Sequence, residues 1–314
     1  MRFWKLWVSL ILVNVLSFGV LGYYGWVIYR EAPPIPDRVA AADGRTLLTG
    51  QDIRDGQNVW QSAGGHQMGS VWGHGSYVAP DWSADWLHRE SEWLLNHWAK
   101  QDFNADSYAG LDDEKQAELK ARLKKELRTN TYDPGTRVLT VSNLRAQAIE
   151  AVGQHYASLF GDDPALSELR EAYAIPARVL RDPERQRLMN AFFFWTAWAC
   201  ATNRPGQEIT YTQNWPPEHW IDNQPTGPIV VWSVLSFVLL LAGIGALAWY
   251  YAVIKQKAGE EPPLPDRDPL LALQPTPSMK ATLPYFWVVT ALIVVQVGLG
   301  AVTAHYGVEG SGFY

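Results

Sequence analysis

Three stretches of the chain contain no Asp, Glu, Lys or Arg: residues 6–29, 228–254 and 281–304, which are 24, 27 and 24 residues long. Each exceeds the roughly 20 residues with which a helix crosses a bilayer. The pattern predicts a mainly α membrane protein with three transmembrane helices. The first stretch also has features of a cleaved signal peptide. We favour a helix that stays in the membrane, because the apolar part of a signal peptide is usually about 7–15 residues long.

The pattern of polar and apolar residues between the apolar stretches predicts further helices and segment boundaries. In the long polar part, Leu119, Leu123 and Leu127 recur every four residues between charges, which predicts an amphipathic helix over 112–130. Similar patterns predict helices over 141–160, 165–174 and 183–201, so this part is expected to be mostly helical. The expected segments are a transmembrane anchor (1–30), a water-exposed domain (31–227), a second transmembrane helix (228–254), a loop (255–280), and a third transmembrane helix with the start of a further loop (281–314).

Short charged flanks predict the orientation, because Lys and Arg beside membrane helices stay in the cytoplasm. Arg2 and Lys5 precede the first span, and four Lys or Arg residues lie in the loop 255–280. We therefore expect the N-terminus and this loop on the cytoplasmic side of a bacterial inner membrane. The 31–227 domain is then extracytoplasmic, which means periplasmic in a Gram-negative cell.

Composition narrows the function. Lys and Arg number 26 against 32 Asp and Glu, so no basic surface for nucleic acid is indicated. The single cysteine, Cys200, excludes an intramolecular disulfide, a multi-cysteine zinc site and a C-x-x-C-H haem attachment within the chain. It lies in an aromatic helix and is expected to be a buried packing residue. The 16 Trp residues favour a domain that sits at a membrane surface.

Histidine positions bear on redox chemistry. A b-type haem or a non-haem iron among membrane helices needs imidazole ligands that project from the spans. None of the three apolar stretches contains an internal His. The chain alone is therefore not expected to build a membrane-embedded redox centre.

The most distinctive sequence is a block rich in Gly and Trp. It runs from Gly56-Gln57-Asn58-Val59-Trp60 into residues 64–82, GGHQMGSVWGHGSYVAPDW. Further characteristic residues lie in 85–90, 195–206 and 303–314. With these motifs the chain resembles, over essentially its whole length, the N-terminal part of the quinol-dependent, single-chain nitric oxide reductases.

The resemblance implies an extracytoplasmic domain like a cytochrome c that has lost its haem, followed by the first helices of a catalytic subunit of the haem–copper oxidase kind. In the related cytochrome subunit this block leads into C-x-x-C-H. The corresponding residues here are 65–69, where both cysteine positions and the ligand position are vacant. His66 is displaced from the ligand place, so we expect a surface or turn histidine rather than a metal ligand.

The glycine-rich stretch 73–81 lets backbone carbonyls approach a ligand or a neighbouring surface closely. One interpretation is a tight loop packed under Trp72 and Trp82. The resemblance implies another: the matching loop of the family faces the catalytic subunit, and the carbonyls at Gly75 and Tyr77 help to hold a calcium ion. Calcium favours such oxygen ligands, and its other ligands would come from later residues.

His305 and Glu309 are four residues apart, so they share one face if the third helix continues. A His beside a carboxylate can accept a proton from a quinol hydroxyl. The spacing alone favours an interfacial anchor whose polar groups reach water. The resemblance implies the first role, because the family's quinol site uses the His and Glu of this stretch together with residues from later helices.

The resemblance therefore implies the N-terminal part of a quinol-dependent nitric oxide reductase, a family whose complete members oxidise membrane quinol and convert two NO to nitrous oxide and water. Haem b of low-spin and high-spin type, non-haem iron and calcium are the cofactors that the resemblance implies for the complete enzyme. We expect a fragment or truncated product without activity alone, whose partners are the remaining catalytic helices, quinol and lipid. The alternative is a non-enzymatic, membrane-anchored module that packs on a separately encoded catalytic subunit.

Overall fold

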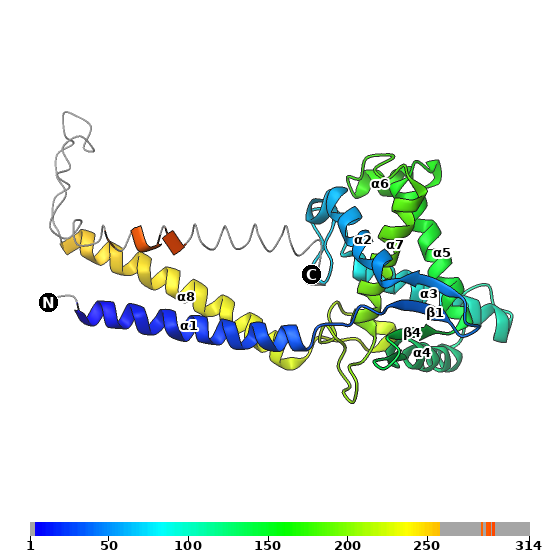
Figure 1. Ribbon diagram of the computed structural model, residues 1–314, viewed down its shortest axis with the longest axis horizontal. Helices are drawn as coiled ribbons and strands as arrows, with labels where there is room; N and C mark the ends of the chain where they lie inside the picture. Colours follow the sequence, from blue (N-terminus) through cyan, green and yellow to red (C-terminus); the bar gives the residue numbers. More distant parts are fainter. Residues whose placement is uncertain (1–3, 258–283, 285–286, 290, 293–314) are drawn as a thin grey trace. The chain divides into compact units, whose positions relative to one another are not determined.

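The computed structural model describes residues 4–257, 284, 287–289 and 291–292 (Figure 1). The chain divides into two compact units, Met1–Leu239 and Leu240–Tyr314. The elements of the described residues are α1 (Trp4–Arg30), β1 (Arg38–Ala41), β2 (Thr46–Thr49), α2 (Gly50–Ser62), the 3₁₀ helix η1 (Gly65–Met68), α3 (Trp82–Phe103), η2 (Tyr108–Gly110), α4 (Asp113–Arg128), β3 (Tyr132–Asp133), β4 (Val138–Val141), α5 (Asn143–Phe160), η3 (Pro164–Leu166), α6 (Ser167–Ala172), α7 (Pro183–Ala201), η4 (His219–Ile221) and α8 (Gly227–Lys257).

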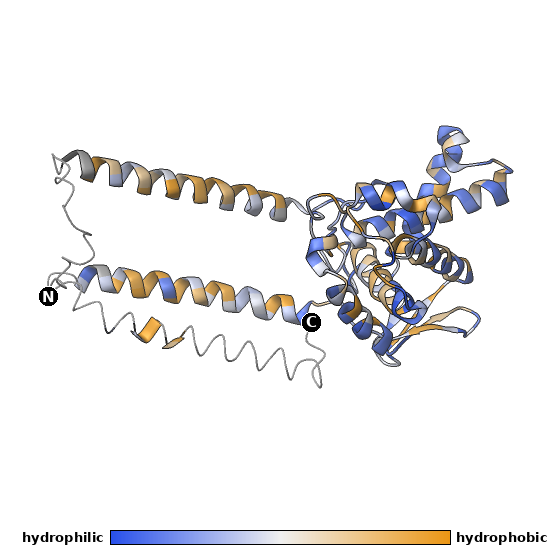
Figure 2. Ribbon diagram, turned by 90° about the horizontal axis from the view of Figure 1, so that it is seen from above, coloured by the Kyte–Doolittle hydropathy of each residue, from blue (hydrophilic) through white to orange (hydrophobic). Residues whose placement is uncertain are grey.

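Two of these helices are long and apolar enough to cross a membrane. The segment Trp7–Arg30 lies in α1 and Val230–Ile254 lies in α8, and the apolar colouring along both helices is visible in Figure 2. They coincide with the first two stretches that the sequence predicts as spans, and they indicate a membrane protein. The third stretch, 281–304, and the loop 255–280 lie largely outside the described residues.

The helices of the domain begin where the sequence offers capping side chains. Thr49 and Asp52 form a capping box at the start of α2. The carboxylate of Asp81 caps α3, Ser142 caps α5, and Asp182 caps α7 directly before a proline. The predicted helices over 112–130 and 183–201 are confirmed as α4 and α7.

Two of the predicted helix boundaries need correction. The helix expected over 141–160 begins at Asn143, because Val141 pairs in β4 and Ser142 is the cap. The helix expected over 165–174 is a 3₁₀ turn, η3, followed by the short α6, which ends at Ala172.

A small sheet that the sequence analysis did not predict closes one side of the domain. Its strand order is β2-β1-β4-β3. The central pair β1 and β4 is parallel and aligns Val39 with Leu139, while both outer pairs are antiparallel. The parallel pair joins segments about 100 residues apart, so the sheet ties the start of the domain to its middle.

Aromatic side chains fill the interior between α3, α5 and α7. Trp82 stacks on Phe193 with 5.6 Å between ring centroids, and Trp86 stacks on Tyr156 at 5.3 Å. Four tryptophans are almost completely buried: Trp82, Trp86, Trp98 and Trp198. Of the tryptophans on α3, Trp82, Trp86 and Trp98 are thus core residues, whereas Trp93 is only half-buried.

Candidate functional site

The glycine-rich loop between η1 and α3, residues 69–81, is held from inside by one carboxylate. Asp81 is 6% exposed. Its Oδ2 accepts from the Ser70 hydroxyl at 2.7 Å and from the Gly73 N–H at 2.6 Å, while its Oδ1 accepts from the Ala84 N–H at 3.0 Å and from the Ser83 hydroxyl. One side chain thus caps α3 and fixes the path of the loop.

The backbone of the loop folds back on itself. Ser70 Oγ accepts from the Gly75 N–H at 2.7 Å, and the Ser76 N–H donates to the Ala79 carbonyl at 2.9 Å. Gly75 has φ 85°, and a Cβ there would lie 2.7 Å from the Ala79 oxygen. This position therefore requires glycine.

Indole groups fasten the same loop to the rest of the domain. Trp72 Nε1 donates to the Thr196 carbonyl of α7 at 3.0 Å, and Trp215 Nε1 donates to the Gly73 carbonyl at 2.9 Å. The ring of His74 packs against that of Trp215 at 4.6 Å. The predicted packing of the loop with its tryptophans is confirmed, and the loop is a firmly held structure.

The tip of this rigid loop points into solvent. Tyr77 is fully exposed and Val78 is 45% exposed. No other large hydrophobic side chain of residues 31–227, all of which the structure describes, is as exposed. Within the described part of the chain, the carbonyls of Gly75 and Tyr77 accept no hydrogen bond. The tip therefore offers an aromatic side chain and free carbonyl oxygens to a partner.

The donor set of the tip limits which metal it can hold. Carbonyl oxygens suit calcium, which takes six to eight oxygen ligands. The only carboxylate of the loop is Asp81, whose oxygens face inward and accept four hydrogen bonds. The loop alone thus supplies part of a calcium site at most.

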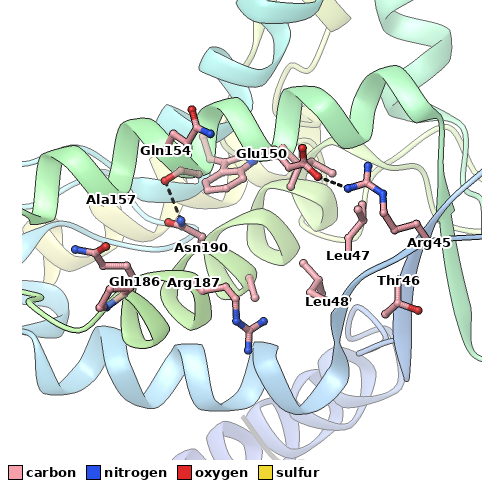
Figure 3. Close-up of a pocket in the computed structure, with 15 residues that line it drawn as sticks. Arg45, Thr46, Leu47, Leu48, Glu150, Gln154, Ala157, Gln186, Arg187 and Asn190 are labelled. Atoms are coloured by element: carbon pink, nitrogen blue, oxygen red, sulfur yellow. Dashed lines mark hydrogen bonds and ion pairs between the residues drawn. The ribbon is translucent and has the colours of Figure 1, made fainter.

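A separate cavity of about 510 Å³ lies between β2, α5 and α7 (Figure 3). Arg45 pairs with Glu150 at 2.5 Å, and Arg187 pairs with Asp52 at 2.9 Å and with Glu184 at 2.6 Å. Because both cations already have carboxylate partners, the cavity does not call for an anionic ligand. Its remaining polar side chains are three carboxamides and the hydroxyl of Thr46, which do not indicate a particular ligand.

Comparison with known proteins identifies the family of the domain. Residues 36–217 match the family model for the NorB cytochrome c-like domain of nitric oxide reductase, which covers more than half of the chain. The chain belongs to this family. No curated protein matches it.

Membership of the NorB family suggests a component of an oxidoreductase, and the two apolar helices suggest association with a lipid bilayer. The residues predicted for the quinol site, His305 and Glu309, lie outside the described residues. Gly75 and Tyr77, predicted as calcium ligands, are on the loop tip with free carbonyls. The structure therefore shows where Gly75 and Tyr77 lie, and both the calcium site and the quinol site stay predictions.

The structure also shows the positions of His66 and Cys200, the residues considered above for metal binding and haem attachment. His66 is exposed in η1 and contacts the edge of Trp60 at 5.0 Å between ring centroids, so the expected surface position is confirmed. Cys200 is buried in α7, as expected, and burial raises the pKa of its thiol far above the usual range. A buried thiol on α7 does not fit a covalent haem attachment after α2.

A cluster of titratable groups at the end of the domain was not among the predicted sites. Glu218, 5% exposed, accepts from His88 Nδ1 at 2.9 Å and lies 3.2 Å from His219 Nδ1. The His88 ring stacks on Trp220 at 4.4 Å. We call this cluster of His88, Glu218, His219 and Trp220 the histidine clasp. It joins α3 to the segment that leads into α8, and the sequence offered only the neighbouring Glu218-His219-Trp220 as a signal.

A buried ion pair was missed as well. Arg145 Nε donates to Glu90 Oε1 at 2.6 Å, and Trp86 Nε1 donates to the other carboxylate oxygen at 3.1 Å. Both charged residues are nearly inaccessible, with side chains 4% and 0% exposed. The pair links α3 to α5 inside the core and has no access to a substrate, so its role is structural.

Proposed function

We propose that the chain is the N-terminal part of a quinol-dependent nitric oxide reductase, which couples oxidation of quinol to quinone with conversion of two NO to nitrous oxide and water. The family match supports the assignment to a nitric oxide reductase. The observation that carries the role of the domain is the rigid loop 69–81, whose exposed tip fits a surface that docks on the catalytic helices. In this proposal the domain is extracytoplasmic at a bacterial inner membrane.

The domain itself carries no haem in this proposal. The chain has one cysteine, which is buried, and the residues at the position of a haem attachment are 65–69 without any cysteine. Stacked aromatic rings fill the interior between α3, α5 and α7. The haem b groups and the non-haem iron that perform electron transfer and NO reduction would be held by the remaining catalytic helices.

Calcium at the loop tip is part of the same proposal. The free carbonyls of Gly75 and Tyr77 would provide two oxygen ligands, and the catalytic helices would provide the others. The ion would then bridge the domain and the catalytic part. A structure of the complete assembly without metal beside Gly75 would contradict this.

His305 and Glu309 are proposed to bind quinol. Replacing His305 with Ala in the complete assembly should raise the quinol KM severalfold or abolish quinol oxidation, because the imidazole would no longer accept a hydrogen bond and a proton. Haem content should stay unchanged. The measurement is NO consumption at varied quinol concentration, with the haem absorption spectrum as the control for assembly. Unchanged quinol kinetics would rule out the role.

A second function, a non-enzymatic module that packs on a separate catalytic subunit, is also compatible with the exposed loop tip. The two differ in where the catalytic helices are encoded. A reading frame that continues beyond Tyr314 into apolar helices with internal histidines would support the first, and a separate gene for these helices would support the second.

A further inference from the structure

A polar cavity of about 460 Å³ lies beside the C-terminal turn of α4. Its charged lining consists of Lys124, Lys125 and Arg128 against Glu208 and Asp222. Three cations face two carboxylates here, although the net charge of the whole chain is −6. The cavity is therefore a locally positive site on an acidic protein.

The buried member of this group, Arg128, has no counter-ion. It is 8% exposed, and its Nη2 donates to the Glu208 carbonyl at 2.7 Å and to Asn214 Oδ1 at 3.2 Å. Its Nη1 donates to Asn223 Oδ1 at 3.2 Å and to the Ile221 carbonyl at 3.5 Å. All four acceptors are neutral, and no described carboxylate lies within ion-pair distance of the guanidinium.

A buried cation without a counter-ion is costly, because hydrogen bonds to neutral oxygens compensate only part of the lost hydration. Burial accordingly lowers the pKa of Arg128, against the opposing effect of Asp222 and Glu208. Asp222 is itself engaged by Lys124 Nζ at 2.7 Å. The charge balance of the cavity would improve if an anion entered it.

Lys125 leaves a second positive charge available at the cavity. It is exposed, and its ammonium group makes no ion pair with the described residues. The cavity of Figure 3 differs in this respect, since both of its arginines are matched by carboxylates. The free ammonium group of Lys125 can donate hydrogen bonds to phosphate oxygens, and the charge of Arg128 behind it would attract the anion without a direct hydrogen bond.

The end of α4 does not oppose an anion, although the C-terminus of a helix is its negative pole. The Lys125 carbonyl accepts from the Thr129 N–H at 3.2 Å and from the Thr129 hydroxyl at 2.6 Å. The Leu127 carbonyl accepts from Thr202 Oγ1 at 3.0 Å, and the Arg128 carbonyl accepts from the Asn203 N–H at 3.0 Å. These carbonyls are occupied by protein donors and are not presented to the cavity.

Lining residues of the cavity are close in the sequence to residues that lead to both apolar helices. Its lining residue Asn203 precedes Arg204, whose guanidinium pairs with Glu31, the residue directly after the end of α1. Asp222 lies eight residues before Val230, the start of the second candidate span, a stretch that reaches about 28 Å at most. Chain connectivity thus keeps the cavity within this distance of the start of a candidate span, and anionic lipid headgroups would lie at the end of such a span.

We propose that this cavity binds the phosphate group of an anionic membrane lipid, with Lys124 and Lys125 at its entrance and the buried charge of Arg128 behind them. The phosphate oxygens would accept hydrogen bonds from the two ammonium groups and would supply the negative charge that Arg128 lacks. The inference rests on membrane attachment and is independent of quinol or NO chemistry.

The test uses Lys125→Gln in the full chain, because Lys125 is exposed and without an ion-pair partner among the described residues, so the variant should fold normally. The matched control is Lys100→Gln: Lys100 is also an exposed lysine in the last turn of a helix, α3, and lies outside this cavity. Each protein, in micelles of a neutral detergent, is titrated with phosphatidylglycerol or with phosphatidylcholine. The Tm is followed by tryptophan fluorescence.

We expect phosphatidylglycerol to raise the Tm of the parent chain and phosphatidylcholine to leave it unchanged. Lys125→Gln should weaken the apparent affinity for phosphatidylglycerol about fivefold, the effect of losing one lysine near an anionic headgroup. Lys100→Gln should bind like the parent. An equal response to both lipids, or an equal loss in both variants, would overturn the proposal.

A competition experiment with inorganic phosphate distinguishes a lipid headgroup from a soluble phosphate as the ligand of the cavity. If the lipid is the ligand, millimolar phosphate should compete with phosphatidylglycerol only weakly, because it lacks the acyl chains that concentrate the headgroup at the micelle. If inorganic phosphate alone raises the Tm as much as the lipid does, the assignment to a lipid is wrong and the cavity is a site for a soluble phosphate.

Discussion

The charge state of the histidine clasp depends on pH, because the pKa values of His88 and Glu218 are both shifted by their contact. Burial tends to raise the pKa of Glu218, but hydrogen bonds from His88 and from the Trp220 N–H outweigh it and lower that pKa below its ordinary 4.5. The hydrogen bond to Glu218 raises the pKa of His88 above its ordinary 6.5, against the opposing effect of burial. Other charges near His88 are Glu92 and Asp85 on the same helix, and His219 flanks Glu218.

The sign of the pH dependence follows from these shifts. The raised pKa of His88 contributes stability that is complete below about pH 6.5 and is lost as the pH rises through its folded value. The lowered pKa of Glu218 contributes stability above about pH 4.5 that is lost on acidification. The clasp should therefore be strongest between these values, in the range of mildly acidic pH.

We predict that Glu218→Gln removes this dependence. Between pH 8 and pH 6 the parent chain should gain about 0.5–1 kcal/mol relative to the variant, a size limited by the half-exposed His88 side chain. The measurement is denaturant unfolding of both proteins at several pH values. Gln207→Glu, a charge change at an exposed position outside the clasp, serves as a control. A constant difference between parent and Glu218→Gln across the range would contradict the prediction.

At the element scale, the crossing of α2 and α7 depends on Gly56. A Cβ at this position would lie 2.0 Å from the Leu188 carbonyl oxygen and 2.9 Å from the Phe192 Cβ, so the two backbones would have to separate. Trp60, further along α2, packs against Phe192 at 5.7 Å between ring centroids. The absence of a side chain at Gly56 thus sets the distance between the helices.

We predict that Gly56→Ala destabilises the domain by about 2–3 kcal/mol, although alanine favours helix over glycine by about 1 kcal/mol. Gly153→Ala on α5 is the matched control, because a Cβ there approaches only the side chain of Asn190, at 3.1 Å, and no backbone atom of a neighbouring helix. It should change the free energy of unfolding by less than about 1 kcal/mol. Urea unfolding of the two variants distinguishes close backbone contact from helix propensity, and equal effects would refute the role of Gly56.

The sequence predicted the helices better than the sheet, for a physical reason. Helices such as α4 carry a repeated leucine spacing and capping side chains, which are local signals. The strands have only two to four residues, too few for an alternating pattern. Moreover, β1 pairs in parallel with β4 about 100 residues away, and that partnership depends on packing across the domain.

Across the whole molecule, site features that depend on neighbouring residues could be predicted from the sequence, whereas contacts between distant residues could not. The glycines at 73 and 75 predicted a tight loop, because glycine is a local requirement of such turns. The pairing of His88 with Glu218 spans 130 residues and that of Glu90 with Arg145 spans 55, and no spacing rule connects them. Likewise, the burial of Asp81 and the exposure of Tyr77 in the same loop are visible only in the folded structure.

The exposed side chain of Tyr77 at the loop tip allows a test of whether this loop docks on the catalytic helices. Tyr77 is fully exposed, and among the described residues its side chain makes no hydrogen bond or ring contact. Tyr77→Ser should therefore leave the unfolding midpoint of the 314-residue chain unchanged. If the tip docks on the catalytic helices, the same change should weaken the complete assembly, because a buried aromatic ring contributes about 2–3 kcal/mol to an interface.

The substitution leaves the Tyr77 carbonyl in place, so it tests docking by the side chain separately from metal binding by the backbone. The readout is the temperature at which the complete assembly loses quinol-driven NO consumption, compared with the unfolding midpoint of the chain alone. The control is Tyr132→Ser, a change at a half-buried tyrosine on β3. Unlike Tyr77→Ser, it should lower the stability of the isolated chain. Loss of stability in the chain alone, or an unaffected assembly, would show that Tyr77 does not face the catalytic helices.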